Sequence, residues 1–317
     1  MKKELGIFIL LVVLCAIVSA FNPQFLSATN LQNMARLIGL YGIFSIGLGI
    51  VIITGGIDLS VGSVFALLGV VLSILLSEWG WPAALAVLTV IAIAMGLGAI
   101  HGLLITKLRL QPFIVTLCGL LFYRGLARFI ANDETKGFGA ASGFEWLRDI
   151  ANGMLFGLPT PFILLVIISA VMWVVLHRSV YGRYLFAVGR NETAARYSGI
   201  NSARIVASAY IILGLLAGIA AIVFAFYTNS ISPSSHGISF ELYGIAAAVL
   251  GGCSLRGGEG SIVGILIGSA LLQVLQNLVN LLGIPSSLNF AVLGAVILVG
   301  VMADQILQNR GRRAARA

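Results

Sequence analysis

The sequence predicts an all-α protein that crosses a membrane about ten times, as one transmembrane domain over residues 1–317. Of its 317 residues, 59% are hydrophobic and only 9% are charged, whereas soluble domains carry about 25% charged residues. The apolar residues fall into separate runs near the length of about 20 residues that crosses a bilayer. Glycine, with 38 residues, lets membrane helices approach closely. Soluble enzymes, disulfide-rich secreted domains and nucleic-acid-binding proteins are therefore excluded.

Ten apolar runs predict ten spans, at about 5–21, 34–53, 61–77, 83–105, 112–131, 161–176, 207–227, 242–253, 260–281 and 287–303. The run 242–253 is short, so we expect its helix to begin a few residues earlier. The first run follows two lysines and ends in Val18-Ser19-Ala20, which would pass as a signal-peptide cleavage site. We favour a retained first span, because nothing after it resembles a secreted domain.

The basic residues predict the orientation of these spans. With a cytoplasmic amino terminus, ten spans also place the carboxyl terminus in the cytoplasm. Cytoplasmic segments then hold 14 of the 19 lysines and arginines, and the external loops keep only Lys136 and Arg148 beside six acidic residues. Each inner loop except 54–60 contains basic residues. This bias agrees with the positive-inside rule.

Two loops are long enough to contact partners. In the external loop, about 132–160, Phe144, Leu147 and Ile150 recur at helical spacing, which predicts a short amphipathic helix. That helix either packs on the protein surface or offers a docking surface to an external partner. The second long loop, about 177–206, is cytoplasmic in the predicted topology.

The cytoplasmic loop contains the pattern of a short, capped helix. An N-cap asparagine precedes an acidic first turn, good helix formers, a basic last turn and a C-cap glycine; these residues are Asn191, Glu192, Ala194, Ala195, Arg196 and Gly199. A helix of about two turns is not stable alone in water. The segment is therefore either a linker held by its flanking spans or a docking element for a partner, and the capping residues favour docking.

Two glycine-rich segments interrupt the apolar sequence, at 55–63 and 251–260. Both read Gly-Gly-x-polar-Leu-x-x-Gly. In the first, Gly56 permits a tight turn, and Asp58 or Ser60 is placed to cap the next helix. Alternatively, Asp58 is a functional ionisable group within the membrane. The second segment lacks the Gly-Lys-Ser/Thr of a phosphate loop, and no Walker-type sequence occurs in the chain.

The ninth run combines small residues with a polar stripe. Gly260, Gly264 and Gly268 predict a tight helix contact. Four amides follow at i, i+3, i+4 and i+7, namely Gln273, Gln276, Asn277 and Asn280. Amides facing lipid would be costly, so the stripe either braces neighbouring helices or lines a wet pathway. Neutral amides suit a polyhydroxyl solute, because they donate and accept hydrogen bonds without a fixed charge.

The remaining polar residues of the spans favour transport over catalysis. Arg124 and Arg128 are expected to extend towards the outer interface, and His101 is interpreted as a helix-packing residue. No nucleophile–base pair, zinc signature or carboxylate dyad is visible, so we expect no enzyme activity, no metal and no cofactor. Proton-driven carriers usually contain several buried acids, and only Asp58 qualifies. Transport powered by another chain fits better.

Motifs along nearly the whole chain carry a family resemblance. They are Gly55–Ser63, Gln111–Leu117 with Arg124-Gly125, Tyr181–Arg183 with Gly189–Arg196 and Gly199–Asn201, and Gly251–Leu255 with Gly257-Gly258. In this order they resemble the ribose-type sugar permeases of bacterial ABC importers, within a family that includes branched-chain amino-acid permeases. Cys253 stands where a small polar residue is expected.

The resemblance implies a multi-pass permease subunit of the bacterial inner membrane, surrounded by lipid. It implies three kinds of partner: a second permease chain, identical or paralogous, two cytoplasmic ATPase subunits that use the ATP, and a periplasmic sugar-binding protein. Residues 191–199 match the coupling helix that seats in the ATPase. The expected activity is import of a ribose-, xylose- or galactose-like monosaccharide by alternating access. Another small polar solute, such as an amino acid or nucleoside, and a self-powered carrier are the alternatives.

Overall fold

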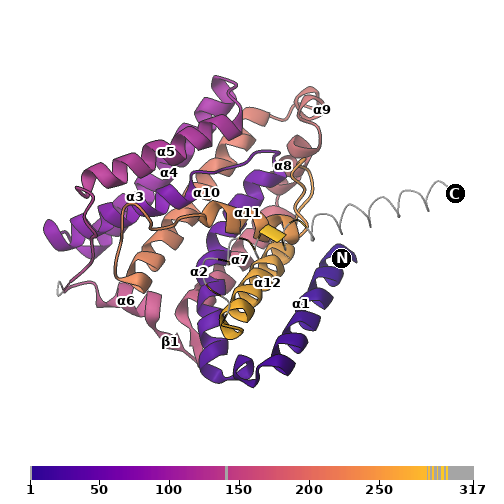
Figure 1. Ribbon diagram of the computed structural model, residues 1–317. Coiled ribbons are helices and arrows are strands. Elements are labelled where there is room, and N and C mark those ends of the chain that lie inside the picture. The colour runs from indigo at the N-terminus through magenta and orange to yellow at the C-terminus, as the bar shows by residue number, and fades with distance from the viewer. Residues whose placement is uncertain are drawn as a thin grey trace.

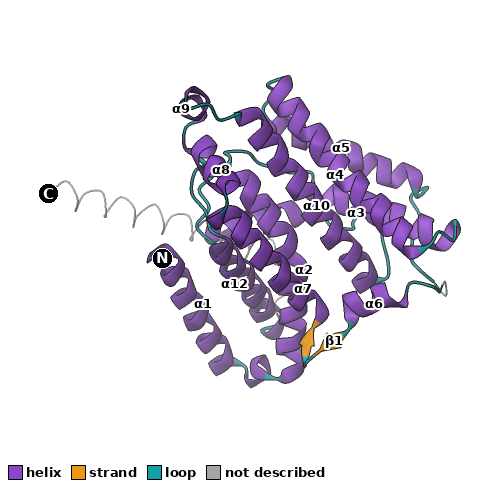
Figure 2. Cartoon of the chain, turned by 180° about the vertical axis from the view of Figure 1, so that it is seen from behind, coloured by secondary structure: helices purple, strands orange, loops and turns teal. Residues whose placement is uncertain are grey.

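The computed structural model describes residues 2–139 and 142–283, together with 285, 288, 291, 294, 295 and 298. The described chain is a bundle of helices (Figure 1) with a single hairpin of two short strands, β1 (Met154–Leu155) and β2 (Leu158–Pro159). Seen from either side, α9 lies at one end of the bundle, and α6 and the hairpin lie at the other end (Figures 1 and 2).

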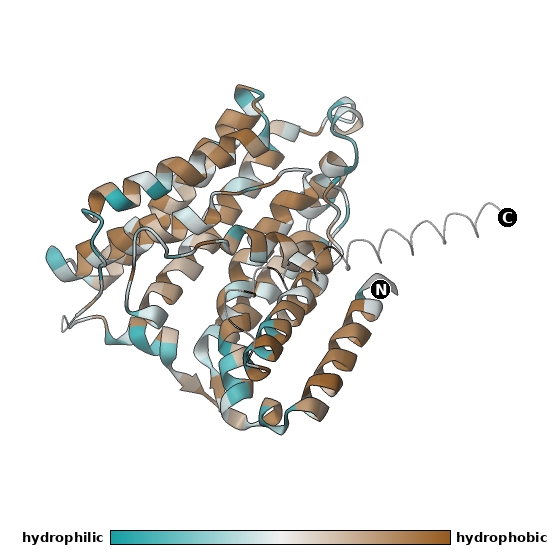
Figure 3. Cartoon of the chain, viewed as in Figure 1, coloured by the Kyte–Doolittle hydropathy of each residue, from teal (hydrophilic) through white to brown (hydrophobic). Residues whose placement is uncertain are grey.

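Eight helices of the described part are long and apolar enough to cross a membrane. They are α1 (Lys2–Phe21), α2 (Ala28–Ile53), α3 (Val61–Ser73) with its π-helical continuation Ile74–Glu78, α4 (Ala83–Lys107), α5 (Pro112–Ile130), α7 (Thr160–Trp173) with its π-helical continuation Val174–Arg178, α10 (Ser202–Thr228) and α12 (Ile262–Leu281). The shorter helices are the 3₁₀ turn Pro23–Leu26, α6 (Glu145–Asn152), α8 (Val180–Arg190), α9 (Glu192–Tyr197) and α11 (Phe240–Leu250). Hydrophobic residues cover most of the long helices, and hydrophilic residues gather mainly at helix ends and in connections (Figure 3).

Eight of the ten predicted spans agree with these helices, and the two exceptions are the runs 242–253 and 287–303. The eighth run forms α11, which begins at Phe240 but ends at Leu250. Its 11 residues extend about 17 Å, against a hydrocarbon core of about 30 Å. α11 therefore begins two residues before the predicted run, as expected, but it is only about half as long as the hydrocarbon core is thick. We call it the half-length helix. The predicted span 287–303 lies outside the continuously described residues.

The core lies around α2, α3 and α10, whereas α1 is peripheral. In each of the three central helices, 78% of the most apolar window is buried, compared with 6% in α1. α1 contacts the rest of the protein through a small cluster in which Val18 meets Val274 of α12. Its remaining apolar side chains, such as Phe8 and Leu10, are about half exposed. This exposure suits a helix whose outer face meets lipid.

Glycines bring several helices into backbone contact. A Cβ atom on Gly98 of α4 would lie 2.3 Å from the carbonyl oxygen of Tyr210 in α10. The predicted tight contact of α12 is also present, since a Cβ on Gly264 would lie 2.0 Å from the Gly251 carbonyl and one on Gly268 would lie 2.1 Å from the Ala247 carbonyl. Such close approach increases the dispersion contacts between helices. These contacts matter in a membrane, because lipid tails are as apolar as the helices and supply no hydrophobic driving force for helix association.

The long loop that was predicted to be external contains the predicted amphipathic helix, α6. Phe144, which precedes it, and Leu147 are buried. The Phe144 ring lies 5.8 Å from that of Phe138 and 5.6 Å from that of Phe226 in α10. The apolar face of α6 is therefore occupied by the protein itself, which favours the packing interpretation over a docking surface.

Gly98→Val should destabilise the protein by about 1–3 kcal/mol or more, because its side chain would displace the backbone of α10. The matched control is Gly96→Val on the same helix, where a Cβ meets nothing within 4 Å. Thermal unfolding of both purified variants in detergent measures the difference. Equal midpoints would contradict the close contact of α4 and α10.

Candidate functional site: a buried break in the membrane domain and a cytoplasmic helix

The segment between α2 and α3 is not helical, and Asp58 organises it. Asp58 is 3% exposed. One carboxylate oxygen accepts hydrogen bonds from the backbone N–H and the hydroxyl of Ser60, each at 2.7 Å. The side chain of Ser60 does not cap α3. Asp58 therefore shapes the turn before α3 from inside the bundle, rather than from an exposed membrane edge.

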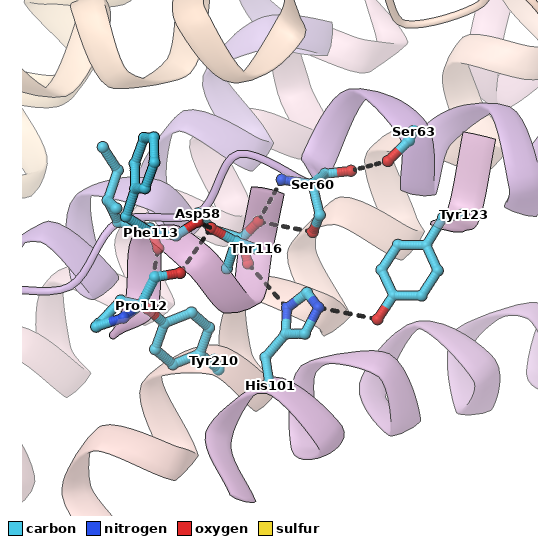
Figure 4. A network of polar contacts seen from close by, with 10 residues as sticks. Asp58, Ser60, Ser63, His101, Pro112, Phe113, Thr116, Tyr123 and Tyr210 are labelled. Carbon is cyan, nitrogen blue, oxygen red and sulfur yellow. Dashed lines mark hydrogen bonds and ion pairs between the residues drawn. The ribbon is translucent and has the colours of Figure 1, made fainter. Parts of the chain in front are cut away.

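Two further side chains extend this buried network (Figure 4). The second carboxylate oxygen of Asp58 lies 3.3 Å from His101 Nδ1 in α4, and His101 Nε2 lies 2.8 Å from the Tyr123 hydroxyl in α5. His101 is thus more than a packing residue. Its partners are 43 and 22 residues away in sequence, so local spacing carries no signal for them.

A small cavity adjoins the network and is lined by side chains of α3, α4 and α10 together with Asp58 and Ser60. Tyr210 of α10 borders it and donates a hydrogen bond to the Ile57 carbonyl at 3.0 Å. A Cβ on Gly56 would lie 2.8 Å from that tyrosine hydroxyl. Gly56 therefore leaves room for the side chain that bonds the broken backbone.

Arg124 is half-buried and bonds the backbone of neighbouring segments, and its expected extension to the outer interface stays a prediction. Its guanidinium donates to the carbonyls of Pro233 at 3.1 Å, His236 at 2.7 Å and Gly62 at 3.2 Å. A Cβ on Gly62 would lie 2.1 Å from the Gly237 carbonyl. The first turn of α3 thus contacts the segment that leads into α11, and Arg124 bonds both.

The capped helix predicted in the cytoplasmic loop is present as α9. The side chain of Asn191 accepts a hydrogen bond from the Ala194 N–H at 3.0 Å. At the other end, Gly199 has φ +84°. Its N–H donates to the Arg196 carbonyl, and the Ile200 N–H donates to the Ala195 carbonyl, each at 3.0 Å. This pair of bonds is the Schellman motif, so local capping defines both ends.

α9 is anchored on one face and exposed on the other. Ala195 is buried, and the Glu192 carboxylate accepts a hydrogen bond from the Ser202 hydroxyl at 2.9 Å, which holds α9 to the start of α10. Arg196 is exposed, and Tyr197 is 90% exposed. Tyr197 is not part of the capping pattern, so the sequence carried no signal for it. An exposed tyrosine beside an arginine is typical of an interface anchor.

The four amides of α12 do not act as one set. Gln276 donates to the Tyr243 hydroxyl of α11. Asn277 and Asn30 of α2 exchange hydrogen bonds of 3.1 and 2.6 Å. Gln273 is buried at 3% exposure, and Asn280 is exposed. Gln276 and Asn277 therefore brace neighbouring helices, and a role in lining a pathway stays a prediction.

Within the described part of the chain, no group of three histidine, cysteine or acidic side chains is placed to hold a metal ion. Cys253 is buried and Cys118 is exposed, and both are free thiols. The chemistry of the site is thus hydrogen bonding within a buried break, combined with an exposed capped helix on the side that the charges assign to the cytoplasm.

Comparison with known proteins places this arrangement in a family. Residues 30–301 match the family described as branched-chain amino acid transport system / permease component. No solved structure matches the chain.

Individual relatives match over nearly the whole length. The chain is 40% identical to the ribose import permease protein RbsC of Bacillus subtilis (strain 168), over 96% of this chain and 93% of that protein. It is also 40% identical to the RbsC of Escherichia coli (strain K12), over 93% and 92%. The xylose transport system permease protein XylH of Escherichia coli (strain K12) is 30% identical, over 97% and 93%. The chain therefore belongs to the family of transport-system permease components.

Proposed function

We propose that this protein is the permease subunit of an ATP-driven importer that carries a monosaccharide across the bacterial inner membrane. The observation that carries the proposal is α9, a capped helix with exposed Arg196 and Tyr197, in a permease-family chain without a Walker-type sequence. The chain is a transporter subunit rather than an enzyme, and ATP hydrolysis belongs to a separate chain. Relatives named for ribose and xylose support a monosaccharide as solute.

Three partners follow from this function. Two ATPase subunits would receive α9 on the cytoplasmic side. A second permease chain, identical or paralogous, would complete the pathway, as the family resemblance implies. A sugar-binding protein would deliver the solute on the periplasmic side. Lipid covers the remaining apolar faces, including most of α1.

Alternating access is the mechanism that this geometry supports best. ATP binding would close the ATPase dimer and displace α9. The membrane domain contains two interruptions that can absorb such a displacement, the segment 54–60 before α3 and the half-length helix α11. Interrupted helices at membrane depth are typical of transport sites. Asp58 and Ser60 would hold the first interruption in a defined conformation.

The solute is expected to be neutral and polar. Gln273 and Asn280 of α12 present amides that can donate and accept hydrogen bonds, as hydroxyl groups require. A second candidate is an amino acid, because the matching family is described by branched-chain amino acid transport. Uptake assays with the complete importer separate the two: monosaccharide uptake supports the proposal, whereas uptake restricted to amino acids contradicts it.

Replacing Glu192 and Arg196 together with alanine, or Tyr197 alone with alanine, should lower ATP-dependent uptake at least about tenfold, because exposed tyrosine and arginine anchors often dominate an interface. The assay is uptake into proteoliposomes that contain the full complex. Assembly of the permease in the membrane should persist, and Lys107→Ala, an exposed change on α4, is the matched control. Full uptake by the α9 variants would refute the coupling role. Nucleotide-independent uptake by the permease alone would support a self-powered carrier instead.

Tyr123→Phe should destabilise the protein by about 1–3 kcal/mol, because His101 Nε2 would lose its partner in a buried site. Tyr184→Phe is the control, since Tyr184 is 42% exposed. Thermal unfolding in detergent compares the two variants. If both unfold at the wild-type temperature, the network does not support the break.

Single cysteines at positions 273 and 280 should differ in labelling in a variant without the native cysteines. Position 280 is exposed and should react with a hydrophilic maleimide, whereas position 273 is buried and should react only if it faces a wet pathway in some transport state. Labelling with and without ATP measures this. Protection of position 273 in every state would leave it a bracing role.

A further inference from the structure

Three segments that are distant in sequence meet through their backbones beside α9. They are the end of α2, the last turn of α8 and the loop between α11 and α12. The N–H of Gly258 donates to the Ile53 carbonyl at 2.8 Å. A Cβ on Gly189 would lie 1.8 Å from that same carbonyl oxygen and 2.6 Å from the Gly258 nitrogen. We call this contact the glycine joint and define it as Ile53, Gly55, Gly189, Gly257 and Gly258.

Glycine is required at the joint for two reasons. Gly257 and Gly258 have φ values of +82° and +75°, which disfavour other residues. Space is the second reason, since a Cβ on Gly257 would lie 2.6 Å from the Gly189 oxygen and 2.9 Å from the Gly55 nitrogen. Three backbones thus touch with no side chain between them. Contacts packed this closely transmit displacement, because protein interiors are only slightly compressible.

The joint is continuous with α9. α8 ends at Arg190 and α9 begins at Glu192, so only Asn191 separates them. The backbone N–H of Asn191 donates to the Ala187 carbonyl of α8 at 3.0 Å, and its side chain caps α9. A displacement of α9 therefore moves the last turn of α8, which carries Gly189.

The joint is also continuous with both interruptions of the membrane domain. Ile53 is the last residue of α2, directly before the segment that contains Asp58. Gly257 and Gly258 lie in the loop that connects the half-length helix α11 to α12. The loop after α11 and the end of α8 lie on the same side of the bundle as α9 (Figure 1). One contact point thus links the docking helix to two breaks that are about 200 residues apart in sequence.

On the basis that α9 contacts the ATPase subunits as proposed above, we infer that the glycine joint is a rigid link that moves both breaks together when α9 is displaced. Gly189, Gly257 and Gly258 are then positioning residues of the transport cycle. This role requires no contact of theirs with solute or with the ATPase. These glycines hold the end of α2 and the loop after α11 at fixed positions relative to α9.

The first test is Gly189→Ala in the complete importer, reconstituted in proteoliposomes with its ATPase subunits and binding protein. The added methyl group separates α8 from Ile53 and Gly258, so solute imported per ATP hydrolysed should fall about tenfold or more. Gly96→Ala is the matched control, because a Cβ there meets nothing within 4 Å. An unchanged ratio in Gly189→Ala would overturn the inference.

The second test uses the wild-type importer and does not depend on a variant that folds. Hydrogen–deuterium exchange should give the Gly258 amide equal protection without nucleotide and in the ATP-bound state, because a rigid link keeps its bond to Ile53 throughout. Loss of protection in either state would mean that the joint opens, and the inference would be wrong. If the wild-type complex itself shows no ATP-dependent uptake, the proposed function is wrong. If the wild type imports solute and Gly189→Ala leaves the solute imported per ATP unchanged, only the inference about the glycine joint is wrong.

Discussion

The architecture depends on one constraint: buried backbone groups that leave a helix need a hydrogen-bond partner inside the protein. The segment between α2 and α3 meets this requirement with contributions from distant elements. Asp58 accepts the Ser60 N–H, Tyr210 donates to the Ile57 carbonyl, and Gly258 donates to the Ile53 carbonyl. Without these bonds, each buried and unpaired group would cost several kcal/mol.

The same constraint explains why charged residues lie inside an otherwise apolar bundle. Asp58 is costly to bury alone, but it accepts two hydrogen bonds from Ser60 and faces His101. Arg124 bonds three carbonyls that belong to the first turn of α3 and to the segment before α11. These charges therefore maintain interrupted backbone, which a transporter uses and which a simple helical bundle would lack.

Glycine has different consequences at different places in this protein. Between α4 and α10 it produces a continuous helix contact, in which Gly98 approaches Tyr210. At the end of α8 it brings three backbones to one point beside α9. The first arrangement favours a fixed pair of helices, and the second is the contact through which we propose that α9 moves the membrane segments. A permease driven by a separate ATPase needs both properties.

The sequence by itself determined the membrane class, eight of the spans and the ends of α9. Composition and run length decide the first two, because the bilayer selects long apolar helices. α9 was predictable because Asn191 and Gly199 act on their own neighbours. Only the tertiary structure decided which polar groups pair. The partners of His101, Arg124 and Asn277 come from segments that are distant in sequence, and neither local spacing nor periodicity records which segments meet, because that depends on the packing of the whole bundle.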